Sequence, residues 1–222
     1  MTEDDAAAWL RSDLGVSRET MDALDRFASF LRLEAQSQNL ISASTLDQIW
    51  SRHIVDSAQL LKFVHTPEPT MRWLDLGSGA GFPGLIIALL SDFHVTLVES
   101  RARRIDYLQR AIGMLDLTRR VHVAGVTLER LDSAPFLVIS ARAFAPLPKL
   151  FELAERFASN NTLWLLPKGR NAGQELEDSR NVWDADFQVM PSITDQEAGI
   201  LVGTLSGRRY SEADPGTQGQ KR

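Results

Sequence analysis

A glycine-dense turn between an expected strand and an expected helix constrains this chain more than any other feature of its sequence. Residues 74–84 read Leu-Asp-Leu-Gly-Ser-Gly-Ala-Gly-Phe-Pro-Gly, so an apolar stretch runs directly into four glycines. Glycine allows a tight turn and admits a ligand where a Cβ would collide. Pro83 suits the first turn of the helix that we expect to follow. The pattern predicts a strand–loop–helix unit that holds a nucleoside cofactor, with a purely structural turn as the alternative.

Two cofactor classes compete for this loop. Residues 79–84 satisfy the dinucleotide pattern G-x-G-x-x-G, which is a weak match by itself. The alternative is D-x-G-x-G-x-G, which resembles the first motif of class I S-adenosylmethionine-dependent methyltransferases and is formed by Asp75, Gly77, Gly79 and Gly81. A dinucleotide brings an anionic pyrophosphate to the helix N-terminus, and the Asp75 carboxylate would oppose it. S-adenosylmethionine carries a cationic sulfonium instead, so the charge of Asp75 favours S-adenosylmethionine.

The rest of the chain fits this cofactor reading. Short apolar runs alternate with helical patterns, as in a parallel sheet covered on both faces. The expected strands cover residues 72–76, 94–99, 121–124, 137–140 and 162–166, and the expected helices cover 83–90, 101–113, 147–158 and 171–179. Residues 187–190 and 199–205 should form an antiparallel pair at one edge. We predict an α/β, Rossmann-like fold of the class I methyltransferase type, with a mainly parallel seven-stranded sheet and an antiparallel edge strand.

In the segment before the expected sheet, apolar residues follow a helical period. Apolar residues from Met21 to Leu31 recur at helical spacing behind a possible Ser17 cap, and a second long helix is expected over 46–64. The proline-containing stretch 66–69 reads as a linker. The expected division is an N-terminal helical extension packed on the core over 1–66, a methyltransferase domain over 67–206 and a flexible tail over 207–222.

Composition excludes several kinds of chemistry. The chain has no cysteine, which rules out disulfides, thiolate metal sites and a cysteine nucleophile. Its four histidines are scattered without ligand spacing, so no metal is expected. The longest apolar run, 85–90, is far shorter than the ~20 residues that span a bilayer, and the acidic N-terminus is unlike a signal peptide. We therefore expect a cytoplasmic protein, a monomer with no membrane contact.

Charge is unevenly distributed along the chain. The net charge is −5, but residues 101–120 hold six arginines against two aspartates. Arginines at the start of the expected helix oppose its dipole, which hints at phosphate contact, although a solvated face is an equal alternative. An acidic protein with such a basic face can still bind nucleic acid.

The residues that are missing narrow the methyl acceptor. Methylation of pyrimidine carbon 5 usually needs a cysteine nucleophile, which this chain lacks. Methylation of an exocyclic amine is usually marked by an Asn/Asp-Pro-Pro-aromatic loop after the fourth strand, and residues 140–146 read Ser-Ala-Arg-Ala-Phe-Ala-Pro instead. An acceptor with a free lone pair, such as guanine N7, needs positioning and desolvation but no general base.

Four blocks resemble the ribosomal RNA small-subunit methyltransferase G family, also called glucose-inhibited division protein B. They are Asn39–Ala43, Trp50–Ser57 (Trp-Ser-Arg-His-Ile-Val-Asp-Ser), the glycine loop with its Phe-Pro-Gly extension, and Ser140–Phe144 followed by Leu166–Gly169. The resemblance covers roughly residues 25–205. It departs from the family pattern at Ala141, an extra residue before Arg142, and at Pro167, which interrupts a Leu-Lys-Gly element.

The resemblance implies N7 methylation of one guanosine of 16S rRNA within the small ribosomal subunit. Carried over residue by residue, it implies cofactor contacts at Gly77 and Phe82, an adenine contact near Leu128 and Glu129, and a positioning role for Arg142 at the methyl-donor pocket or the target nucleotide. No obligate general base is expected.

Other assignments rest on position in the sequence. Asp75 could bind the cofactor or brace its own loop. Glu99 ends the second strand, where ribose hydroxyls are expected, or is a solvated acid. His53, on an apolar helical face, is predicted to be a core histidine, with a functional role as the alternative, and Trp50 is predicted to pack in the core. Phe144 is predicted to be core filling or a base-stacking platform. The expected RNA contacts are Arg101, Arg103, Arg104, Lys168 and Arg170.

Two other functions stay open at this point. The chain could be a class I methyltransferase that acts on a small molecule or a protein, in which case the arginines of 101–120 would have no role in turnover. It could also be a nucleotide-sensing regulator with a decayed site. The intact Gly77, Gly79, Gly81 and Glu99 speak against the regulator.

Overall fold

The structure is a computed structural model and describes residues 1–64 and 71–209. The linker expected at 66–69 and the tail from 210 onward lie outside the described residues. Within the described part, no helix is both long enough and apolar enough to cross a membrane.

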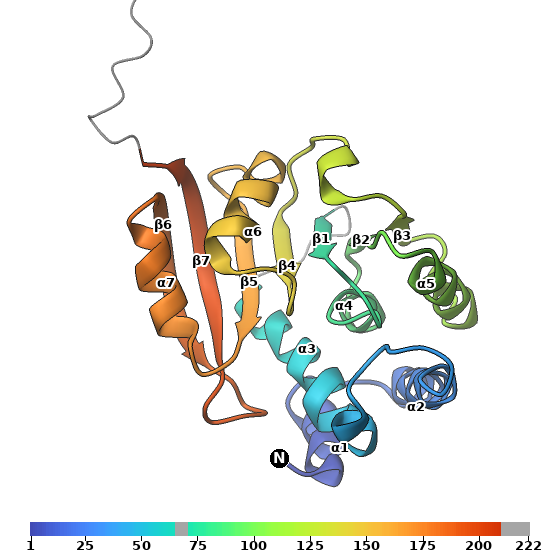
Figure 1. The fold of residues 1–222 in the computed structure, drawn as a ribbon. Coiled ribbons are helices and arrows are strands. Elements are labelled where there is room, and N and C mark those ends of the chain that lie inside the picture. Colours follow the sequence, from blue (N-terminus) through green and yellow to red (C-terminus); the bar gives the residue numbers. More distant parts are fainter. Residues whose placement is uncertain (65–70, 210–222) are drawn as a thin grey trace, which may run out of the picture.

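One mixed sheet organises the chain, and Figure 1 shows it face-on. Its strand order is β3-β2-β1-β4-β5-β7-β6. The strands are β1 (Arg72–Leu76), β2 (His94–Val98), β3 (Val121–Ala124), β4 (Val138–Ala141), β5 (Leu163–Lys168), β6 (Trp183–Pro191) and β7 (Gly199–Arg208). The first five strands pair in parallel, and β7 is antiparallel to both β5 and β6. This arrangement confirms the predicted fold class, including the antiparallel edge.

Helices cover both faces of the sheet. They are α1 (Glu3–Ser12), α2 (Arg18–Glu34), α3 (Asp56–Ala58), α4 (Gly84–Leu90), α5 (Ala102–Met114), α6 (Leu147–Ala154) and α7 (Ala172–Arg180). One apolar core joins the N-terminal helices, α4 and α5 to the face that carries Trp73, and a second joins α6 and α7 to the face that carries Leu74. Neighbouring residues of β1 serve opposite cores because side chains alternate along a strand.

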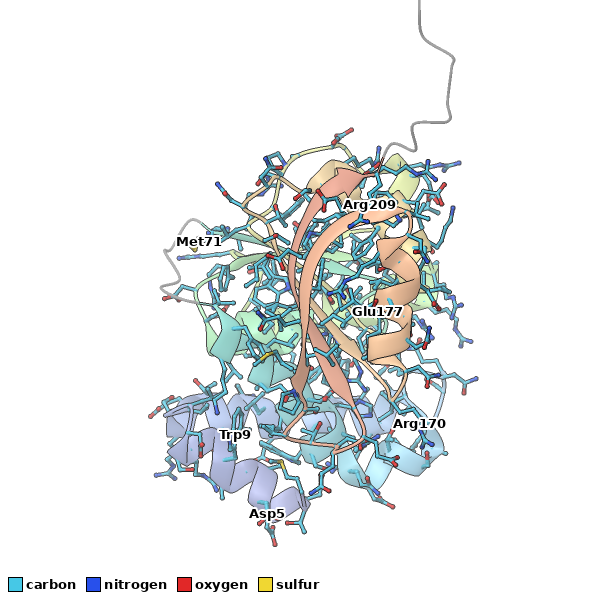
Figure 2. All side chains as sticks on the ribbon, turned by 90° about the vertical axis from the view of Figure 1, so that its left-hand side faces the viewer. Asp5, Trp9, Met71, Arg170, Glu177 and Arg209 are labelled. Carbon is cyan, nitrogen blue, oxygen red and sulfur yellow. The ribbon has the colours of Figure 1, made fainter. Side chains whose placement is uncertain are left out.

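The N-terminal segment packs on the core through α1 and α2. Thr2 caps α1, since its side chain accepts from the Asp5 N–H, and Ser17 caps α2 as predicted, accepting from the Thr20 N–H at 3.2 Å. Edge-on, Figure 2 shows Asp5 and Trp9 at the N-terminal end of the molecule, below the long edge strands.

The second long helix expected over 46–64 is present as one helical run over 43–63, but its hydrogen bonding is irregular. The run passes through η1 (Ala43–Gln48, 3₁₀), η2 (Trp50–Val55, π), α3 and η3 (Gln59–Phe63, 3₁₀). The Glu3 carboxylate accepts the backbone N–H groups of Trp50 and Ser51 at 3.0 and 2.8 Å, so these donors are taken by a side chain at the start of η2. A wide π-turn redirects the side chains that follow, and such turns are frequent at functional sites.

Three strands are longer than the sequence predicts. β6 spans Trp183–Pro191, although only 187–190 was expected. β5 continues through Pro167 to Lys168, where it pairs with β7, whereas β4 pairs with β5 only as far as Leu165. β7 runs to Arg208, two residues into the segment expected as tail. The helix expected over 147–158 ends at Ala154 and closes with a 3₁₀ turn, η5 (Glu155–Phe157).

Candidate active site

The glycine loop lies between β1 and α4, at the carboxyl end of the sheet. Gly77, Gly79 and Gly81 all have positive φ, at 69°, 54° and 92°, which L side chains rarely adopt. A Cβ on Gly77 would lie 2.5 Å from the ring of Phe144, and one on Gly81 would collide with Leu85. The loop therefore needs glycine for both conformation and space.

Asp75 braces this loop through hydrogen bonds within the chain. Its carboxylate is fully buried and accepts from the Ser140 hydroxyl at 2.9 Å and the Gly84 N–H at 3.2 Å. Burial raises the pKa of Asp75 to about 6, while the hydrogen bonds from Ser78, Ser140 and Gly84 act in the opposite direction. Both oxygens are engaged within the chain, so the geometry favours the bracing role, and direct cofactor contact stays a prediction.

A first pocket of about 320 Å³, which we call the cofactor pocket, opens beside the loop. The structure brings together four of the predicted cofactor residues here: Gly77, Glu99, Leu128 and Glu129. Leu128 and Glu129 belong to the short turn η4 (Leu128–Arg130) that follows β3. Arg101, Arg104 and Phe144 also line it, although the sequence suggested other roles for them. The sequence did not single out the remaining lining residues, which are Val98, Ser100, Val126, Thr127, Ala143 and Leu153.

Glu99 is oriented by its own backbone. Its Oε1 accepts the N–H groups of Ser100 and Arg101 at 2.8 and 2.9 Å, and its side chain is only 7% exposed. Oε2 faces Arg104 at 3.6 Å. Oε1 is thus fixed by the backbone, and Oε2 lies beside Arg104 in a side chain that lines the cofactor pocket.

Arg104 lies differently from the surface arginine that the sequence predicts. Its guanidinium donates to the Asn39 carbonyl at 3.0 Å and approaches Glu99, so it borders the cofactor pocket. Arg101 and Arg103 are exposed and line a shallow groove with residues 35–39. Of the three arginines, Arg103 is the one most clearly directed to the outside.

A second pocket of about 700 Å³, which we call the acceptor pocket, adjoins the first. Ala143 and Phe144 line both pockets and separate them. Ala143 has φ 49°, an uncommon conformation for alanine, and such conformations cluster at ligand sites. Phe144 is partly buried, so its ring is neither plain core nor free surface.

The acceptor pocket contains Arg142 and Lys168 from the predicted set. It also contains charged residues that the sequence did not single out, and most of its charges are paired: Arg52 with Asp195 at 2.9 Å, and Lys168 with Glu175 at 2.8 Å. Arg170, also predicted, is 75% exposed, pairs with Glu197 and lies on the outer surface near α7 (Figure 2).

Arg142 follows β4 and meets the N-terminal segment. Its Nη2 lies 2.8 Å from His53 Nδ1, and its Nη1 lies 3.6 Å from the Asp56 carboxylate. Nη1 is buried and has no hydrogen-bond partner among the described residues. Burial, together with Arg142 and Arg52, lowers the pKa of His53 to about 3.

Phe82 packs against the His53 ring that contacts Arg142. Its ring stacks on His53 at 5.0 Å between centroids and meets Phe27 edge-on at 5.6 Å. Phe82 is only 6% exposed and lines neither pocket, so its predicted cofactor contact stays a prediction. His53 and Asp56 belong to the Trp50–Ser57 block, and the resemblance of that block to the family was the sequence signal for them.

Known proteins resemble this chain over most of its length. The family model described as GidB, rRNA small subunit methyltransferase G, matches residues 20–199. A protein of Rhizorhabdus wittichii named ribosomal RNA small subunit methyltransferase G is 51% identical over 222 residues, covering 100% of this chain and 98% of its own length. One of the same name from Zymomonas mobilis is 47% identical, with 92% of this chain and 94% of that protein covered.

Solved structures agree on the fold. A putative O-methyltransferase from Klebsiella pneumoniae superposes with a TM-score of 0.58 at 15% identity, covering 89% of this chain and 94% of that one. A SAM-dependent methyltransferase from Aquifex aeolicus gives a TM-score of 0.56 at 16% identity, with 78% and 97% covered.

Proposed function

The chain belongs to the rRNA small subunit methyltransferase G family, and from that premise we propose that it methylates N7 of one guanosine of 16S rRNA, guanine 527, using S-adenosylmethionine. We further propose that it acts as a monomer in the cytoplasm, on rRNA within the small ribosomal subunit, without a metal ion or a membrane. The family and its shared name support the reaction, and the two adjoining pockets supply the place for it.

The cofactor pocket fits S-adenosylmethionine. Its volume of about 320 Å³ lies within the range of roughly 300–1,000 Å³ that is usual for small-ligand sites. Glu99 Oε2 would accept from the ribose hydroxyls, and Leu128 would pack on the adenine. The missing Cβ of Gly77 leaves backbone access for the methionine end. When bound, S-adenosylmethionine supplies a methyl group activated by a cationic sulfonium.

The single observation that carries the proposal is the meeting of the two pockets at Ala143 and Phe144. With the ribose at Glu99, the methionine end lies toward Gly77, which contacts Phe144. That end of the cofactor pocket adjoins the acceptor pocket. A purine held in the acceptor pocket could therefore present N7 across this junction.

This chain's residues would then orient the purine and exclude water. N7 has a free lone pair, so no residue of this chain would have to remove a proton from the acceptor atom. The methyl carbon would pass to N7 as its bond to sulfur breaks, which leaves S-adenosylhomocysteine and a positive charge on the purine. The π face of Phe144 would favour a cation on either side of the junction. Arg142 would position the purine from the opposite wall, its charge offset by Asp56.

RNA beyond the target nucleotide would contact Arg101 and Arg103, the exposed arginines beside the cofactor pocket, with Arg170 on the far side of the acceptor pocket. Lys168 would reach the nucleotide from within the acceptor pocket, and Arg104 would stabilise the cofactor end. Phosphate contacts of this kind make affinity fall steeply as salt concentration rises.

The proposal is tested by incubating the protein with radiolabelled S-adenosylmethionine and small ribosomal subunits from a strain that lacks this methylation. We expect label in 16S rRNA and 7-methylguanosine at one position by mass spectrometry. Arg142→Ala should lose methyl transfer while retaining the fold. Cofactor binding without labelled RNA would overturn the proposal and favour a small-molecule or protein acceptor.

A further inference from the structure

The contact between Arg142 and His53 fixes which nitrogen of the imidazole carries the proton. A guanidinium has only donors, so the 2.8 Å contact requires His53 Nδ1 to accept from Arg142 Nη2. The proton of the neutral ring therefore lies on Nε2, which donates to Thr45 Oγ1 at 2.9 Å. The Thr45 hydroxyl in turn donates to the Ser42 carbonyl at 3.0 Å. All three bonds have a consistent direction from Arg142 to the backbone.

The ring is held firmly in this orientation. His53 is 5% exposed, stacks on Phe82 with an interplanar angle of 20°, and lies in the π-turn whose start is fixed by Glu3. A protonated ring could not accept from Arg142. The lowered pKa of His53 keeps the ring neutral across the physiological range.

Arg142 needs such support because its other contacts are weak. Its Nη1 lies beyond hydrogen-bond distance of Asp56, and no other described residue accepts from it. The centre of its guanidinium is 5.9 Å from the centroid of Phe82. Within residues 1–64 and 71–209, the bond to His53 is thus the one short side-chain hydrogen bond of Arg142, and it sets the plane of a guanidinium that lines the acceptor pocket.

We propose that His53 is a positioning residue, which acts by accepting from Arg142 Nη2 and so orients the guanidinium toward the acceptor nucleotide. The inference rests on the proposed function, because it assigns the acceptor pocket to the RNA base. It also gives the N-terminal segment a part in catalysis, since that segment supplies the buried His53 that contacts Arg142, a residue of the pocket lining.

Two amide substitutions separate this role from simple core filling. In His53→Asn, the amide oxygen falls near the place of Nδ1 and can accept from Arg142. In His53→Gln, the amide reaches the place of Nε2 and keeps the contact to Thr45 instead. Both variants lose the stacked ring, so thermal unfolding should place them close together in stability.

Single-turnover methylation of small ribosomal subunits gives the decisive comparison. We expect the rate of His53→Gln to lie about tenfold to a hundredfold below that of His53→Asn, the loss typical of one hydrogen bond to a charged group. Equal rates, or a faster His53→Gln, would overturn the inference. A wild-type protein that methylates no RNA would overturn the proposed function itself, and the inference with it.

A double-mutant cycle checks that His53 acts through Arg142. We expect His53→Gln to slow the wild-type protein but to add little further loss in an Arg142→Lys background, because the positioned group is already gone. Affinity for S-adenosylmethionine, measured by calorimetry, should stay unchanged in all of these variants. Additive losses across the cycle would refute the coupling.

Discussion

Arg142 Nη2 and His53 Nδ1 lie 2.8 Å apart although 89 residues separate them in the chain. Arg142 directly follows the fourth strand, and His53 belongs to a π-turn before the sheet begins. Two neighbours of His53 in the same segment, Arg52 and Asp56, line the acceptor pocket beside Arg142. The segment therefore contributes to the site as well as to the apolar core.

Glu99→Gln should weaken cofactor binding while leaving the fold intact. The substituted amide can keep its oxygen on the N–H groups of Ser100 and Arg101 but replaces Oε2 with a donor. We expect the Kd for S-adenosylmethionine, measured by calorimetry, to rise about tenfold or more. The exposed Glu155→Gln is the charge-matched control. An unchanged Kd for Glu99→Gln would contradict the ribose assignment.

Gly77→Ala should damage both stability and binding. The new methyl group meets Phe144 at a positive φ, so we expect the free energy of unfolding to fall by about 1–3 kcal/mol and cofactor affinity to drop. Gly113→Ala is the control, since its Cβ meets no atom within 4 Å in helix α5. That variant should gain about 0.4–1 kcal/mol. Equal free energies of unfolding in urea for the two variants would contradict this prediction.

Asp75→Asn should change the pH dependence of stability. Burial raises the folded pKa of Asp75 to about 6, above its ordinary value of 3.8, so its contribution to stability is fully present below pH 3.8 and is lost as pH rises through 6. An amide does not titrate. The free energy of unfolding of Asp75→Asn relative to wild type should therefore increase from pH 4 to pH 7. A constant or decreasing difference would show that the pKa of Asp75 is not raised in the folded protein.

Arg103→Glu should weaken RNA binding without weakening the fold. The residue is exposed in the first turn of α5, where a carboxylate suits the helix dipole and an arginine does not. We expect equal or slightly higher thermal stability, with lower RNA affinity and a shallower dependence of affinity on salt. Arg119→Glu makes the same charge change at an exposed position before β3. Equal losses in the two variants would indicate a general charge effect.

The sequence by itself determined the parallel sheet, its antiparallel edge and the glycine loop. Periodicity and glycine placement are local properties, so they can be read without knowing what packs against them. Glu99 follows the second strand and Gly77 follows the first, so the sequence predicted that the two lie close together, because the carboxyl ends of parallel strands meet at one edge of a sheet.

Only the tertiary structure decided what the polar residues do. Asp75 was ambiguous until Ser140, from a neighbouring strand, was seen to occupy its oxygen. The roles predicted for Arg104 and His53 rested on their own segments. Contacts of Arg104 with Asn39 and Glu99, and the contact of His53 with Arg142, changed both interpretations. The π-turn inside the expected helix was not visible in the sequence for the same reason, since Glu3, from α1, accepts the N–H groups at its start. Hydrogen bonds between segments far apart in the chain leave no periodic signal, so they appear only when the fold brings their partners together.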